Sequence, residues 1–78
     1  MSKRLMIVDD AMFMRLIIKD VAEKASWEVV GEAANGEEAV AIYHQAHPDL
    51  VTMDLVMPKM GGLEALKALK HIDPSARV

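Results

Sequence analysis

Two short apolar runs, each ending directly in aspartate, constrain this chain more than any other feature. Residues 5–8 lead into Asp9 and Asp10, and residues 50–53 lead into Asp54. Short apolar runs rich in β-branched residues are typical of parallel strands that are buried on both faces. Such strands end at one edge of the sheet, where open α/β folds bind their ligands. Carboxylates gathered there would repel one another, so the pattern predicts a site for a cation.

The composition indicates one small domain. At 78 residues, a single core contributes only about 3–5 kcal/mol of stability, and without cysteine no disulfide adds to it. The lack of cysteine is compatible with the cytosol. A net charge of −3 argues against a nucleic-acid-binding surface, which needs a basic face. Because no apolar stretch is long enough to span a bilayer, we expect a soluble cytoplasmic protein.

The segment after Asp10 changes to helical periodicity, which predicts an amphipathic helix over about residues 11–25. Charged side chains occupy its other faces. The predicted apolar stripe comprises Phe13, Met14, Ile17, Ile18, Val21 and Ala25.

Strands and helices alternate in the rest of the chain. Residues 28–33, with Val29 and Val30, are predicted to form a short second strand. Asn35 and Glu38 have the spacing of a capping box, which predicts a second helix that ends at His47-Pro48. A third helix is predicted from the spacing of Leu63, Leu66 and Leu69, and Asp73-Pro74 would end it. Residues 76–78 are predicted to begin a fourth strand. The order βαβαβα with a further strand start predicts a parallel α/β sheet.

Several motifs together carry a family resemblance: Asp9-Asp10, residues 31–36, residues 47–54, and residues 57–66 with Met57-Pro58 and two glycines. In order and spacing they resemble the receiver domain of bacterial two-component response regulators, and residues 9–15 are most similar to the single-domain chemotaxis regulators. The resemblance implies a flavodoxin-like (CheY-like) fold with strand order 2-1-3-4-5. Residues 1–78 would be a partial receiver domain, the βαβαβα portion with the start of a fourth strand.

The resemblance also implies a chemistry for the acidic residues. Asp54 would be the phosphoacceptor, which takes a phosphoryl group from a phosphohistidine of a sensor histidine kinase. The cofactor would be Mg²⁺, with Asp10, Asp54 and the backbone carbonyl of Val56 as direct ligands, and Asp9 would act through a metal-bound water or help to hold the site. Such a domain performs only its own phosphorylation and is otherwise a signalling domain rather than an enzyme.

Simpler interpretations stay open for individual residues. Asp9 and Asp10 could be turn or helix-capping residues. Met12 and Arg15 lie in the region that this family uses for kinase docking, or on a solvated helix face. The spacing of the three histidines does not predict a metal site. An aspartate-nucleophile phosphatase would carry a second Asp two residues after the first, where this chain has Val56.

The resemblance further implies that the chain stops before the later parts of a receiver. These are the hydroxyl residue that ends the fourth strand, the lysine that ends the fifth, the switch aromatic and the output face. A sheet of order 2-1-3 would expose the edge of the strand at residues 50–54, and such an edge pairs with other chains. We therefore expect self-association, and the alternative function is a half-fold fragment that self-associates and does not signal.

Overall fold

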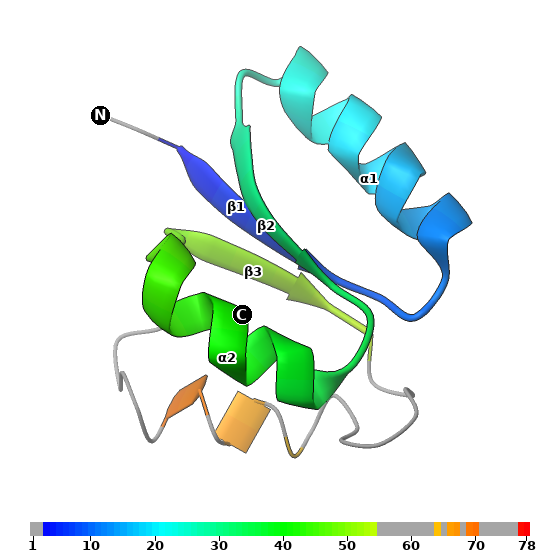
Figure 1. The fold of residues 1–78 in the computed structure, drawn as a ribbon. Coiled ribbons are helices and arrows are strands. Elements are labelled where there is room, and N and C mark those ends of the chain that lie inside the picture. The colour runs from blue at the N-terminus through cyan, green and yellow to red at the C-terminus, as the bar shows by residue number, and fades with distance from the viewer. Residues whose placement is uncertain (1–2, 55–63, 65, 68, 71–76) are drawn as a thin grey trace.

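A three-stranded parallel sheet forms the centre of the computed structural model, which describes residues 3–54, 64, 66–67, 69–70 and 77–78. The strands are β1 (Arg4–Val8), β2 (Glu28–Ala33) and β3 (Leu50–Met53), in the order β2-β1-β3. Helix α1 (Met12–Lys24) covers one face of the sheet and α2 (Gly36–Ala46) the other (Figure 1). All three strands and the order predicted for them are confirmed.

β1 is the central strand, and its apolar composition follows from that position. It pairs in parallel with both neighbours, and Val8 lies opposite Ala33 on one side and Met53 on the other. Residues 5–8 are at most 4% exposed, because helices cover both faces of this strand. The carboxyl ends of β1 and β3 therefore lie side by side, and they deliver the acidic residues that follow to one edge.

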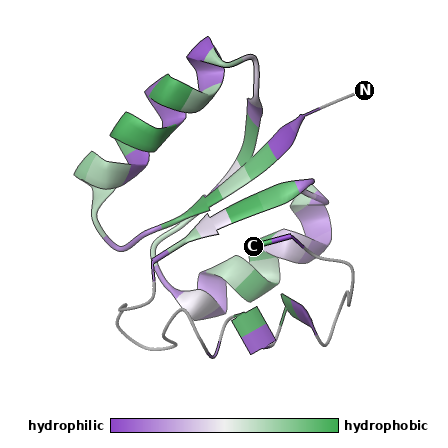
Figure 2. Cartoon of the chain, turned by 180° about the vertical axis from the view of Figure 1, so that it is seen from behind, coloured by the Kyte–Doolittle hydropathy of each residue, from purple (hydrophilic) through white to green (hydrophobic). Residues whose placement is uncertain are grey.

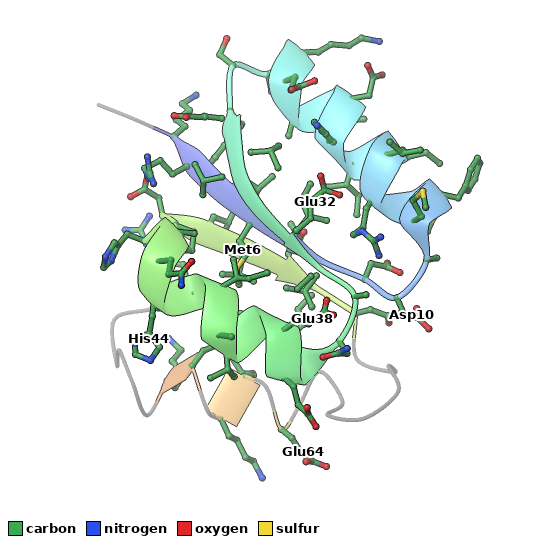
Figure 3. All side chains as sticks on the ribbon, in the orientation of Figure 1. Met6, Asp10, Glu32, Glu38, His44 and Glu64 are labelled. Atoms are coloured by element: carbon green, nitrogen blue, oxygen red, sulfur yellow. The ribbon has the colours of Figure 1, made fainter. Side chains whose placement is uncertain are left out.

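Two apolar clusters stabilise the sheet from opposite faces. The larger cluster lies between the sheet and α2, where Met6 is fully buried (Figure 3), and Tyr43 belongs to the same cluster. The smaller cluster lies under α1, where Leu5, Ile7 and Ala22 are buried and Ile18 and Trp27 pack against them. The alternation of side chains along β1 assigns its residues to the two clusters in turn.

Helix α1 matches the predicted range, but most of its predicted apolar stripe is not buried. Ile18 and Ala22 contact the smaller cluster. Phe13 is 72% exposed and Val21 61% exposed, while Met14, Ile17 and Ala25 are also exposed. The amphipathic pattern is present, but much of the stripe stays exposed because, within the described part of the chain, α1 packs closely on β1 and β2 and not on β3. The side of α1 that does not face β1 and β2 is therefore left exposed, and hydrophobic segments recur along the helix (Figure 2).

The ends of α2 confirm the predicted boundaries. Asn35 is the N-cap, and its Oδ1 accepts from the Glu38 amide at 2.9 Å, while Glu38 Oε1 accepts from the Ala34 amide at 2.8 Å. His47 ends the helix in a left-handed conformation with φ of 47°. The Arg4 side chain donates to the carbonyls of Ala46 and His47, which satisfies acceptors that every helix end leaves open.

The segments predicted to form a third helix and a fourth strand are described only in part. Residues 64, 66, 67, 69 and 70 are helical, Leu69 is fully buried against the larger cluster, and Glu64 and Lys67 are exposed. Arg77 and Val78 are not in a strand, yet the Val51 amide donates to the Arg77 carbonyl at 2.8 Å on the outer edge of β3. Leu63, the loop at 57–62, Asp73-Pro74 and Ala76 lie outside the described residues. Within the described part, no helix is long and apolar enough to cross a membrane.

Candidate functional site

The three acidic residues singled out in the sequence meet at the carboxyl edge of the sheet. Asp9, Asp10 and Asp54 each offer a carboxylate oxygen, and these oxygens all lie within 4.8 Å of one another. They line an open hollow of about 480 Å³ together with Val8, Met53 and, from α1, Met14 and Ile18. Asp10 is exposed, whereas Asp9 and Asp54 are half-buried. The juxtaposition predicted from the sequence is therefore present.

Backbone hydrogen bonds continue the sheet past the strand ends and hold two of these residues in place. The Asp9 amide donates to the Ala33 carbonyl at 3.0 Å, and the Asp54 amide donates to the Val8 carbonyl at 3.1 Å. Asp9 is thereby tied to the end of β2, and Asp54 to the end of β1. The position of each carboxylate then follows from the register of the sheet, not from a long mobile side chain.

Asp9 also serves the local turn. Its Oδ1 accepts from the Ala11 amide at 2.9 Å, which is the two-residue spacing of an Asx turn. The turn interpretation is therefore correct for Asp9, whereas the capping interpretation is wrong, because the N-cap residue of α1 is Ala11 and no side chain caps it. This bond holds the Asp9 side chain beside the start of α1.

Arg15 lies close to this turn and does not occupy a solvated helix face. Its Nη1 donates to the Asp9 carbonyl at 2.5 Å, and its Nε lies 3.4 Å from Glu32 Oε1 on β2. Sequence reasoning placed Arg15 only as a docking or surface residue, because helical periodicity carries no signal for a partner on another strand. Met12, by contrast, is 66% exposed.

The donor set fits a hard divalent cation. Carboxylate oxygens from one edge are the ligands that Mg²⁺ takes in proteins, and it commonly uses only one or two carboxylates with water and phosphate oxygens. Three carboxylates so close together concentrate negative charge, which an ion of charge +2 would offset. Val56, which the resemblance implied as a backbone ligand, lies outside the described residues. His44 and His47 are exposed and are not among the clustered residues.

Comparison with known proteins assigns the family. The model of the response regulator receiver domain matches residues 5–78. Chemotaxis protein CheY of Thermotoga maritima is 54% identical over 78 residues, which are the whole of this chain and 65% of that protein. CheY of Bacillus subtilis is 55% identical over the same length, again 65% of that protein. The chain thus spans slightly less than two thirds of these relatives.

Solved structures agree with this assignment. The CheX–CheY–BeF₃–Mg²⁺ complex from Borrelia burgdorferi contains a chain that superposes with a TM-score of 0.94 at 35% identity, over 96% of this chain and 57% of that one. A LuxR-family two-component response regulator from Aurantimonas gives a TM-score of 0.93 at 37% identity, over 99% of this chain and 56% of that one. With its flavodoxin-like fold and its match to the family model, the chain belongs to the response regulator receiver domains.

Proposed function

We propose that this chain accepts a phosphoryl group on the carboxylate of Asp54. The observation that carries the proposal is the meeting of Asp9, Asp10 and Asp54 within 4.8 Å at the carboxyl edge of the sheet. A lone aspartate at a strand end is common and says little about function. Three of them around an open hollow, in a receiver-domain sequence, supply a carboxylate nucleophile together with ligands for a cation that offsets its charge.

In the proposed step an Asp54 carboxylate oxygen attacks the phosphorus of a phosphohistidine on a sensor histidine kinase. A bond forms between that oxygen and phosphorus, and the phosphorus–nitrogen bond of the donor breaks. Its electron pair stays on the imidazole nitrogen, and the product is an aspartyl phosphate. Carboxylates are established covalent nucleophiles, and the transfer itself depends on positioning and charge stabilisation.

The chain's own residues supply the positioning. The amide of Asp54 is fixed to Val8, so the attacking carboxylate stands at the end of β3 facing the hollow. We propose that Asp9, Asp10, Asp54 and the Val56 backbone carbonyl hold Mg²⁺, as the family resemblance implies. When bound, Mg²⁺ supplies positive charge that offsets the repulsion between the carboxylates and an anionic phosphoryl group.

Similarity supports the finer parts of the proposal. Four of the most similar curated relatives are chemotaxis proteins named CheY, so we propose chemotaxis-type signalling in the cytoplasm with a sensor histidine kinase as donor. A related chain was crystallised with CheX, BeF₃ and Mg²⁺. Beryllium trifluoride has the charge and shape of a phosphoryl group, which agrees with an acceptor site in that relative.

Intact-mass spectrometry after incubation with acetyl phosphate and Mg²⁺ tests the proposal. We expect the wild-type chain to gain one phosphoryl group, and we expect Asp54→Asn to gain none because an amide is not a nucleophile for this step. The gain should also disappear when EDTA replaces Mg²⁺.

Asp20→Asn is the matched control. Asp20 lies on the exposed side of α1, where its carboxylate pairs with Lys24 at 3.1 Å and is not one of the clustered residues. This variant should be phosphorylated like the wild type. A folded wild-type chain that gains no mass would favour the alternative function, a half-fold that self-associates without signalling.

A further inference from the structure

We propose that Arg15 is a positioning residue, which fixes the peptide unit between Asp9 and Asp10 and thereby sets the geometry of the acidic cluster. The inference rests on the proposed function, because it concerns the same cation site. It assigns a role to a side chain that touches neither the phosphoryl group nor the ion, but acts through the backbone of Asp9.

Burial distinguishes Arg15 from its neighbours on α1. Its side chain is only 15% exposed, whereas Met12, Phe13 and Leu16 are 66%, 72% and 56% exposed. A long cationic side chain stays in solvent unless its charge and donors are satisfied. The part of the molecule that buries Arg15 must therefore supply its partners.

Two partners lie on different elements. Nη1 donates to the Asp9 carbonyl oxygen at 2.5 Å, and Nε lies 3.4 Å from Glu32 Oε1. Glu32 stands on the side of β2 that faces α1 (Figure 3). One guanidinium thus connects α1, the end of β1 and β2, and its planar fork allows both contacts at once.

The contact with Asp9 determines the direction of the chain at Asp10. The Asp9 carbonyl belongs to the same planar peptide unit as the Asp10 amide, so holding that oxygen orients the backbone from which the Asp10 side chain leaves. Asp9 is already held by its amide on Ala33 and by its Oδ1 on the Ala11 amide. Arg15 adds a third hydrogen bond to Asp9. This bond is the one at the peptide unit shared with Asp10, whose side chain is exposed.

Lys19 provides a matched control. It lies one turn after Arg15 on α1, and its Nζ is 4.0 Å from Glu32 Oε2. It therefore shares the carboxylate partner and the charge of Arg15 but has no contact with Asp9 among the bonds described. A purely electrostatic or helix-docking role would belong to both cations, whereas the positioning role belongs to Arg15 alone.

The test measures Mg²⁺ affinity by isothermal titration calorimetry and the Asp9 carbonyl ¹³C shift of the metal-free chain by NMR. We expect Arg15→Met to weaken Mg²⁺ binding about tenfold, which is the lower end of losses for outer-shell partners, and to move the Asp9 carbonyl shift. Arg15→Lys keeps the positive charge but loses the planar guanidinium that makes two contacts at once. We expect it to restore less than half of the loss in the logarithm of the Mg²⁺ affinity. Lys19→Met should bind Mg²⁺ with an affinity within twofold of that of the wild type, and its Asp9 carbonyl shift should be unchanged.

If Arg15→Met does not fold, Glu32→Gln serves as the second variant, because it keeps Arg15 but removes the negative charge that holds its side chain. We then expect a changed ¹³C shift of the Asp9 carbonyl and weaker Mg²⁺ binding. Full affinity in Arg15→Met, full rescue by Arg15→Lys, or an equal loss in Lys19→Met would each overturn the positioning role. A folded wild-type chain that does not bind Mg²⁺ would overturn the proposed metal site instead. The metal-free carbonyl shift would still decide whether Arg15 holds the peptide.

Discussion

Gly31 and Ile42 meet so closely between β2 and α2 that a Cβ added at Gly31 would lie 2.8 Å from Ile42 Cγ2. Real Cβ atoms essentially never approach a carbon at this distance. Gly31 pairs with Met6 just after a shift in register between β1 and β2. The glycine is therefore required by the packing of α2 on the sheet, and α2 is the helix that covers the larger apolar cluster.

Gly31→Ala should lower the free energy of unfolding by about 1–3 kcal/mol, the usual cost of overpacking. Urea denaturation followed by circular dichroism measures it. The double variant Gly31→Ala with Ile42→Ala removes the opposing methyl group, so its loss should be smaller than the sum of the two single losses by about 0.5–3 kcal/mol. Additive losses would show that the two residues do not clash.

For Thr52 we predict a substitution that raises the free energy of unfolding instead of lowering it. Its Oγ1 is buried and has no hydrogen-bond partner among the described residues, which costs free energy that an apolar group of the same shape does not. Thr52→Val should therefore raise the free energy of unfolding by about 1 kcal/mol, with urea denaturation as the measurement. Thr52→Ser keeps the hydroxyl and loses the methyl, so it should destabilise. If Thr52→Val destabilised as well, the hydroxyl would have a partner.

The uncovered flank of α1 predicts self-association of the 78-residue chain. Ile17 and Val21 border an apolar hollow of about 310 Å³, whose other wall includes Trp27 and Leu50, and β3 is the outer strand of the sheet beside it. We expect sedimentation velocity to show oligomers that grow with concentration, and Val21→Lys to shift them toward monomer. Leu16→Lys, at an exposed residue of the same helix that does not line the hollow, should not. A wild-type chain that stays monomeric with native helical circular dichroism would contradict this prediction.

The strand ends could be predicted from the sequence because the physics there is local. An apolar run buried on both faces, followed at once by aspartate, places the carboxylate at the edge of a parallel sheet. Asp9, Asp10 and Asp54 meet in the structure as that argument requires. The start of α2 was equally predictable, since the cap contacts of Asn35 and Glu38 lie within one turn.

The burial of α1 and the role of Arg15 could not be predicted in this way. Periodicity reveals that a helix has an apolar stripe but not how much of the stripe the rest of the chain covers, so the exposure of Phe13 and Val21 could not be predicted. Arg15 bonds to a backbone carbonyl and to a carboxylate on β2. Neither partner has a regular spacing from Arg15, and only the three-dimensional arrangement shows them.

Repulsion within the acidic cluster gives the last prediction. Without Mg²⁺, Asp10→Asn removes one of three neighbouring negative charges, so it should raise the free energy of unfolding by a few tenths to about 1 kcal/mol, the range for partly screened charge pairs. With Mg²⁺ the order should reverse. At a concentration 100 times its dissociation constant, the ion would stabilise the wild type by about 2.7 kcal/mol through mass action, and the variant, which lacks a ligand, by much less. Thermal unfolding with and without Mg²⁺ measures both effects, and Asp20→Asn serves as the control because its carboxylate lies outside the cluster. Equal Mg²⁺ stabilisation of the wild type and Asp10→Asn would exclude Asp10 as a ligand.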